Sequence, residues 1–289
     1  MRTRLLTLLL LTLTSTHMHA ASWLDRITLR ESLDDKKVPQ PAFFTLTKPH
    51  DAKSSYTAGI GLRIDLAPDR VSDKLQLGPF LEYAKNTETK KEQDNLKLGL
   101  STDWTVRDIS QERITWTPIV VGKLNYARDH IKKTTSAQAT ILLTPQPRAH
   151  AFDKAFWYYP NIQTDLGPVR FLYSPSIGLE DSDTLRAATS AEERNIVRAV
   201  GRFAITLTLN NDFLKDKLEY NLDLSYRRDL SSTTDRGHRF LQHTLNVFFF
   251  RDTDTDRSAG IGAAYVTGED PSKGFQAQQF IRLGLVIRL

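Results

Sequence analysis

Acidic side chains with regular spacing are the first residues in this chain that could perform chemistry. Asp252, Asp254 and Asp256 alternate along the sequence, as the first carboxylates of a calcium-binding loop do. That loop needs glycine at its sixth position and glutamate at its twelfth, where this chain has Arg257 and Ala263. We therefore interpret the run as a polar hairpin, and we predict no metal site and no cofactor.

Two glycine pairs have the spacing of phosphate-binding loops. They are Gly59-Ile60-Gly61 and Gly260-Ile261-Gly262. A phosphate-binding loop follows a strand and opens a helix, whose N-terminus holds the phosphate. Both pairs lie inside alternating apolar and polar residues with no helical pattern after them, so we interpret the glycines as small positions within strands.

A histidine and several acids fall in or near the polar connections of the chain. They are Glu180, Asp181, Asp183, Asp235 and His238. An acidic hydrolytic site needs carboxylates that meet a histidine. Peptide hydrolysis at the edge of the fold is therefore an alternative function, although we assign no catalytic residue and do not expect an enzyme.

Alternation predicts the elements that must position these groups. A strand sends successive side chains to opposite faces, and in Leu218–Arg227 leucine and tyrosine alternate with polar or ionic residues. We count about twelve such runs, or ten if the two weakest, Ala137–Leu143 and Ala155–Ile162, are not strands. The others are Tyr56–Leu66, Leu75–Ala84, Leu96–Trp104, Ile114–Tyr126, Val169–Leu179, Val197–Leu209, Leu218–Arg227, Leu241–Phe250, Ser258–Thr267 and Phe280–Leu289. Pro79 and Pro118 predict bulges or strand ends, because proline removes a ladder hydrogen bond.

The first twenty residues have the composition of an export signal. Arg2 and Arg4 precede the apolar run Leu5–Leu13, and small residues follow at Ala20 and Ala21. We predict that residues 1–20 are a cleaved signal peptide, with an uncleaved anchor as the alternative. The chain has no cysteine, which excludes disulfides and thiolate chemistry. Without the signal peptide, 37 basic residues face 34 acidic ones, and their scatter predicts no nucleic-acid partner.

The last strand carries the most informative pattern. Ile281, Leu283, Leu285, Ile287 and Leu289 share one face, opposite Arg282, Gly284, Val286 and Arg288. This strand resembles the C-terminal assembly signal of Gram-negative outer-membrane β-barrels, although that class usually ends on an aromatic residue. The resemblance implies an all-β fold: a single up-and-down antiparallel transmembrane β-barrel. It also implies two partners, the barrel-assembly machinery and outer-membrane lipid.

The barrel interpretation divides the chain and sets its dimensions. Residues 21–55 are expected to form a periplasmic arm, in which Phe43–Leu46 adds a strand, and residues 56–289 the barrel. Trp116 and Tyr126 share a face ten steps apart, roughly 25 Å along a tilted barrel, which is the height of an outer-membrane apolar band. We expect the last strand to close against Tyr56–Leu66, and the longest connections, 180–194 and 227–238, to lie opposite the termini.

One histidine lies on the expected lipid-facing side. Outer-membrane phospholipases carry a histidine–serine–asparagine site on their outer wall. His243 has no serine two residues after it, and Asn246 falls on the opposite face. Lipid hydrolysis is therefore an alternative and not the first expectation.

Basic residues on the inward faces favour a passive channel. The candidates for lining the lumen are Arg63, Lys97, Arg170, Arg198, Arg202, Glu219, Asp223, Arg282 and Arg288. Arg198, Arg202, Arg282 and Arg288 have no acids between them within their strands, which predicts a narrow pore that attracts small anionic solutes. The alternative is a lumen braced by ion pairs, as in a structural or export component.

Overall fold

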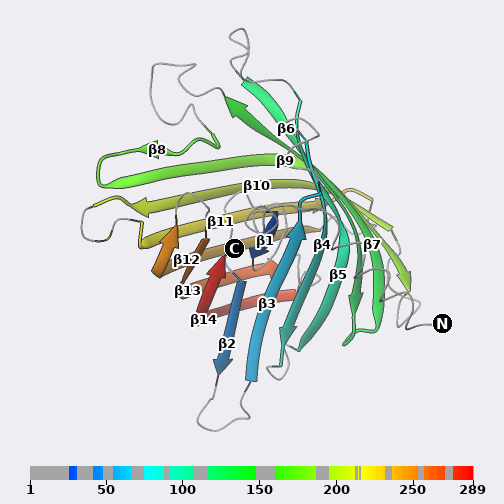
Figure 1. Cartoon of the computed structure of the whole chain (residues 1–289). Coiled ribbons are helices and arrows are strands. Elements are labelled where there is room, and N and C mark those ends of the chain that lie inside the picture. The colour runs from blue at the N-terminus through cyan, green and yellow to red at the C-terminus, as the bar shows by residue number, and fades with distance from the viewer. Residues whose placement is uncertain are drawn as a thin grey trace, which may run out of the picture.

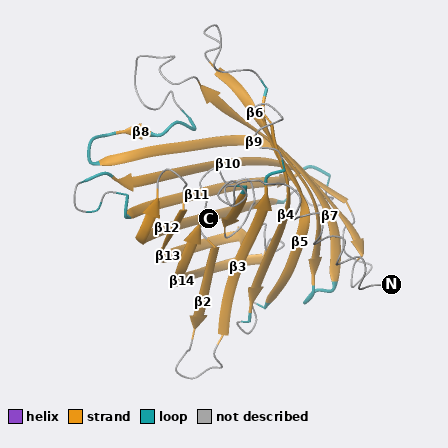
Figure 2. Cartoon of the chain, viewed as in Figure 1, coloured by secondary structure: helices purple, strands orange, loops and turns teal. Residues whose placement is uncertain are grey.

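The fold is a nearly closed antiparallel barrel of twelve strands in up-and-down order (Figure 1). The computed structural model describes residues 26–30, 42–47, 55–66, 75–87, 92–106, 116–147, 160–186, 195–211, 214, 216–231, 236–252, 257–270 and 276–288. These residues form strands and loops and no helix (Figure 2). No helix in this part of the chain is long and apolar enough to cross a membrane.

Eleven long strands make up most of the wall. They are β3 (Ser55–Ile64), β4 (Leu75–Asn86), β5 (Gln93–Thr105), β6 (Trp116–Asp129), β7 (Thr134–Pro147), β9 (Val169–Arg186), β10 (Asn195–Leu209), β11 (Leu218–Asp229), β12 (Gly237–Asp252), β13 (Arg257–Asp270) and β14 (Gln276–Arg288). Each corresponds to one of the predicted runs, and each pairs with the next in the chain. The alternation of apolar and polar residues therefore located these strands correctly.

The twelfth position in the wall is shared by two short strands near the N-terminus. β2 (Ala42–Thr47) pairs with the first half of β3, and β1 (Ile27–Arg30) pairs with its second half. β2 also pairs with β14, through Leu285 opposite Phe44. The expected strand at Phe43–Leu46 is confirmed. The expected direct closure of the last strand against Tyr56–Leu66 is wrong, because β2 lies between them.

The predicted strand at Ala155–Ile162 is wrong in its described part, where residues 160–162 form a turn. No place exists for it in the sheet, because β7 pairs directly with β9. The longest connection, residues 148–168, therefore lies at the end of the barrel where β14 also ends. That corrects the expectation that the longest connections lie opposite the termini. β8 (Thr164–Asp165) belongs to this connection and pairs with β9.

A fork opens between β7 and β9 near this connection. Their ladder ends at Leu143 opposite Ile177, and the next outward position on each strand is a proline, Pro145 and Pro175. Proline has no N–H to donate, so the ladder cannot continue there. Asn161 bridges the fork instead: its Nδ2 donates to the Pro145 carbonyl on β7 at 2.5 Å, and its Oδ1 accepts from Ser174 Oγ on β9 at 2.5 Å.

Pro79 and Pro118 occupy strand positions that tolerate them. Pro79 lies next to Phe80, where the ladder between β3 and β4 ends, and Pro118 lies next to Ile119, where the ladder between β5 and β6 ends. Each proline nitrogen therefore faces the end of a ladder, and the pairing shows no register shift. Neither a bulge nor a strand end is found, because Pro79 lies inside β4, opposite Leu100, and Pro118 lies inside β6, opposite Pro145.

The two faces of the wall differ sharply in chemistry. Outward aliphatic side chains of β14 are highly exposed, with Ile281 at 74% and Leu283 at 62%. Trp116 and Tyr126 of β6 also point outward, at 55% and 47% exposure. The inward positions of the same strands carry most of the buried polar and charged residues. A large apolar outer surface combined with a polar interior reverses the usual distribution in soluble proteins.

Candidate functional site

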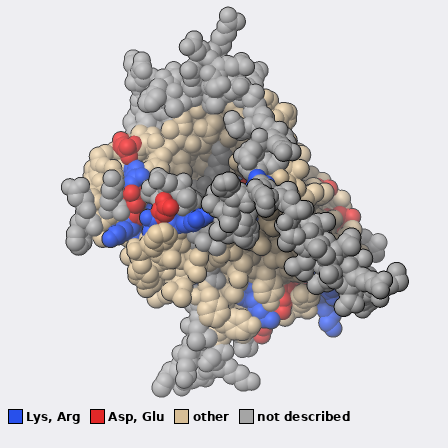
Figure 3. Space-filling model, in the orientation of Figure 1, with Lys and Arg blue, Asp and Glu red and all other residues tan. Residues whose placement is uncertain are grey.

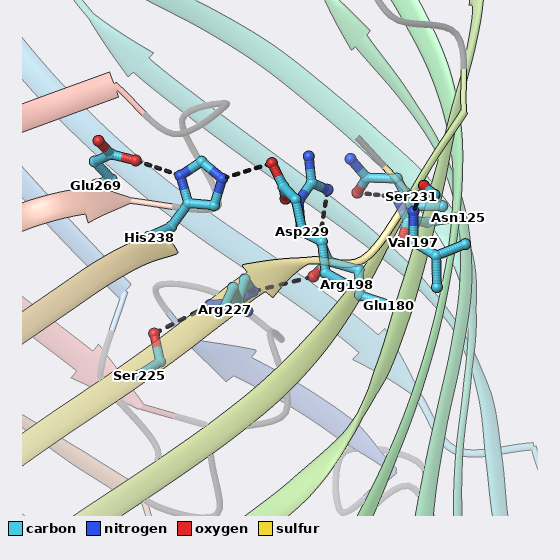
Figure 4. Close-up of polar contacts among 11 residues, drawn as sticks. Asn125, Glu180, Val197, Arg198, Ser225, Arg227, Asp229, Ser231, His238 and Glu269 are labelled. Carbon is cyan, nitrogen blue, oxygen red and sulfur yellow. Dashed lines mark hydrogen bonds and ion pairs between the residues drawn. The ribbon is translucent and has the colours of Figure 1, made fainter. Parts of the chain in front are cut away.

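Charged side chains of β9, β10 and β11 form a buried network on the inward face, near the barrel end opposite the termini (Figure 4). Arg198 is central: its Nη1 lies 3.0 Å from Glu180 Oε1, and its Nε lies 2.8 Å from Asp229 Oδ1. Glu180 also accepts a hydrogen bond from Arg227 Nε at 3.2 Å, and Arg227 Nη1 donates to Ser225 Oγ at 3.0 Å. Register explains these contacts, since Arg198 pairs directly with Glu180 on β9 and with Asp229 on β11.

His238 extends this network onto β12 and β13. Its Nε2 lies 3.3 Å from Asp229 Oδ2, and its Nδ1 contacts Glu269 (Figure 4). Strict alternation would send Glu269 outward, but Gly268 before it has a φ of 101°. A side chain at Gly268 would also press on the Arg239 carbonyl oxygen, so only glycine permits this local backbone. A neutral imidazole has one N–H, so donation to both carboxylates requires the protonated ring.

The opposite wall carries a second buried group. Glu82 of β4 accepts a hydrogen bond from Lys123 Nζ on β6 at 2.9 Å, and its other oxygen lies 3.6 Å from Lys97 Nζ on β5. The Lys123 ammonium also lies 4.5 Å from the centroid of the Phe80 ring, a favourable cation–π distance. Two cations thus share one carboxylate in a setting with little water.

A third set of contacts links the middle of the wall to the end at which β14 finishes. Asp223 pairs with Arg202 at 3.5 Å, and Glu219 pairs with Arg251 at 2.6 Å. Asn221 is fully buried, and its amide joins Glu219 at 2.8 Å and Thr206 at 2.9 Å. At the strand ends, acidic and basic side chains alternate on the left of the face in Figure 3. Arg170 there contacts Asp216, and Arg251 Nη1 donates to the Asp216 carbonyl.

The premise of an unpaired cationic wall is wrong. Arg198 and Arg202, which lack acids on their own strand, find them on the neighbouring strands β9 and β11. Arg63 is likewise paired, with Asp65 at 2.9 Å and Asp103 at 3.0 Å. Arg282 also has interactions, and the side chain of Arg288 lies outside the described residues, as does Leu289. Alternation within one strand does not reveal such partners, because they depend on the register between strands.

The structure separates the acids that were considered for a hydrolytic site. Glu180 and His238 belong to the same buried network, through Asp229 and Arg198. Asp181 and Asp183 fall on the outward face of β9, opposite Val197 and Asn195, and Asp235 lies outside the described residues. Asp229 and Glu269 complete the contacts of His238. The alternating pattern of β11, continued to its next inward position, predicts Asp229. No pattern in the sequence predicts Glu269.

The remaining motifs, two glycine pairs and an aspartate run, form no phosphate or metal site among the described residues. Gly59 and Gly61 lie within β3, and Gly260 and Gly262 within β13, as predicted for strand positions. Asp252 ends β12, and Asp254 and Asp256 lie outside the described residues. Among the described residues, no group of three or more histidine, aspartate and glutamate side chains could hold a metal ion.

His243 lies on the outer wall, as the alternation predicts, and its partner there is a tyrosine. The Oη of Tyr220 is 2.6 Å from His243 Nδ1. Asn246 points inward and is fully buried, so it cannot join His243 in a hydrolytic site.

Known proteins provide no guide to this site. The chain matches no model of a known protein family, and no curated protein matches it. The barrel and the chemistry of its two faces therefore carry the functional conclusion.

Proposed function

We propose that this chain is a β-barrel protein of the Gram-negative outer membrane. The single observation that carries the proposal is the outward face of the barrel. There, exposed aliphatic residues such as Ile281 and Leu283 form the outer surface of a wall whose inward side carries most of the buried polar and charged residues. Lipid stabilises such a surface, whereas water does not. Trp116 and Tyr126 bound the apolar face of β6, where aromatic girdles lie in proteins of this kind.

We further propose that the barrel is a narrow passive channel for small polar solutes. Polar and charged side chains line the inward face of most strands, as a water-filled lumen requires. Because Arg63, Arg198 and Arg202 are paired with acids, their fields largely cancel at a distance. We therefore expect weak charge selectivity and not the strong anion preference that unpaired arginines would give.

A closed barrel with a structural or export role is the second candidate. It is favoured by the burial of Asn221, Glu219 and Asn246, which lie on the inward face and have almost no exposed surface. A buried network of ion pairs fixes the geometry of an interior, but it also occupies the space that a solute would use.

Two measurements test these proposals in order. First, the chain without residues 1–20 should insert into lipid vesicles and migrate as a heat-modifiable barrel. A chain that stays in the aqueous phase with its strands formed would overturn the membrane proposal. Second, planar bilayers containing the folded barrel should show small, reproducible conductance steps. Folded protein without conductance would refute the channel and leave the closed barrel.

A further inference from the structure

The outer wall carries a row of polar aromatic contacts. Tyr220, His243 and Tyr265 project outward from β11, β12 and β13. The Tyr220 and His243 rings lie 6.1 Å apart, and the His243 and Tyr265 rings lie 6.2 Å apart. Gln279 on β14 continues the row, because its Nε2 donates to Tyr265 Oη at 3.0 Å. The row thus crosses four neighbouring strands on one face.

The surroundings of this row are apolar. Along β12, Leu241 and Leu245 flank His243, and the exposed Ile281 of β14 lies directly opposite Tyr265. Polar groups that face lipid are costly unless they have hydrogen-bond partners, so such groups on a barrel wall usually mark function. Tyr220 Oη and His243 Nδ1, only 2.6 Å apart, satisfy one polar atom of each ring.

After this pairing, the row still has N–H or O–H donors that a lipid could use. When the Tyr220 hydroxyl donates to Nδ1, the neutral imidazole carries its proton on Nε2. When Nδ1 donates instead, the tyrosine keeps its own O–H. Tyr265 accepts from Gln279 and still has its own hydroxyl proton to give. In every arrangement the row offers donors to an acceptor that comes from the lipid side.

A cation and an apolar surface lie on either side of the row. Arg239 is exposed on the outward face of β12, four residues from His243 towards the barrel end, and pairs across strands with Tyr226. In the other direction, Ala263 lies between Leu245 and Leu283 on the adjacent strands. Leu245 and Leu283 are exposed at 44% and 62%, so the wall around Ala263 is apolar.

We propose that this surface binds one anionic phospholipid, an inference that rests on the proposed membrane location. Arg239 holds the phosphate, the row at His243 and Tyr265 donates to the ester carbonyl oxygens, and an acyl chain lies over Ala263. The order of cation, donors and apolar wall matches the order of phosphate, ester and chain in such a lipid. One exposed guanidinium at this position fits one phosphate.

The experiment measures lipid binding to the folded full barrel by native mass spectrometry with added phosphatidylglycerol. The variant is Arg239→Gln with His243→Phe, which keeps an aromatic ring on the wall. The control is Arg128→Gln with Tyr126→Phe, an outward arginine and tyrosine two residues apart on β6. We expect the wild type and the control to bind one lipid, and the site variant, which loses the charge-assisted contact of Arg239 and the hydrogen bond of His243, to bind it at least about ten-fold more weakly.

Three results would overturn the proposal. Equal binding by the site variant and the wild type would remove these residues from any lipid site. Equal binding of zwitterionic phosphatidylcholine would show that the surface does not select an anionic headgroup. Preferential binding of a phosphorylated glycolipid, lost in the same variant, would assign the site to that lipid instead. A barrel that folds in vesicles but fails this test leaves the proposed membrane location intact, whereas a chain that does not insert refutes that location first.

Discussion

Glu180 offers the most direct test of the buried network. Its carboxylate lies 3.0 Å from Arg198 and 3.2 Å from Arg227, and all three side chains are largely buried. Glu180→Gln keeps the shape of the side chain but removes its charge. Breaking a buried ion pair costs about 3–5 kcal/mol, because the remaining charge stays buried without a partner. Arg198 retains Asp229 at 2.8 Å, so we expect a loss of about 3 kcal/mol, at the lower end of that range.

The assay is equilibrium unfolding by urea of the barrel folded in lipid vesicles. Asp181→Asn is the matched control, since Asp181 is the next residue but points outward and is exposed, and it should not destabilise the barrel. A double-mutant cycle with Arg227→Met should give a coupling energy above about 1 kcal/mol, because the two side chains are in direct contact. A loss below about 0.5 kcal/mol for Glu180→Gln, or no coupling in the cycle, would refute the network as a source of stability.

Three further predictions concern the wall, the fork and the lumen. Leu283→Arg should lower the free energy of unfolding in vesicles by about 2–4 kcal/mol. Ala277→Arg, on the same face near the strand end, should lower it by only about 0–1 kcal/mol. Equal costs for the two variants would place β14 outside the membrane. Asn161→Gly should lower the free energy of unfolding by about 1–3 kcal/mol, because it removes hydrogen bonds at the fork. Asn161→Ala should lower it further, because Asn161 has a φ of 64°, which alanine adopts only with strain. An alanine variant as stable as the glycine variant would contradict this argument from the backbone conformation. Asp223→Asn removes a negative charge beside Arg202 and should shift the reversal potential in a salt gradient towards anion preference. An unchanged reversal potential would show that this pair does not line the conducting path.

The sequence was sufficient to locate most of the strands, because each strand alternates independently of its neighbours. Leu218–Arg227 shows its two faces without reference to β10 or β12, and the structure keeps that division. The same logic failed at Ala155–Ile162 in its described part, where residues 160–162 form a turn. The fork explains the failure. Pro145 and Pro175 end the ladder between β7 and β9, and β9 already occupies the position beside β7 in the sheet. Short alternating runs therefore need evidence of a pairing partner before they count as strands.

The candidate site was much less predictable, because its chemistry depends on which residues face each other across strands. The sequence shows Arg198 without an acid on its own strand, but the register brings Glu180 and Asp229 to its two sides. A shift of one residue in that register would turn both acids to the outer face and leave Arg198 unpaired. The pairing of charges is thus a property of the sheet, and a charge pattern within single strands cannot establish the selectivity of a pore.

The register between strands also explains how the same alternating pattern gives an inner and an outer surface with different chemistry. On β12, inward His238 meets acids from β11 and β13, while outward His243 meets tyrosines from the same two strands. Inside, His238 is buried and its partners are carboxylates. Outside, the aromatic partners satisfy the histidine with neutral groups, which suits the proposed contact with lipid. The two histidines are five residues apart and differ in role only because an odd spacing along a strand places them on opposite faces.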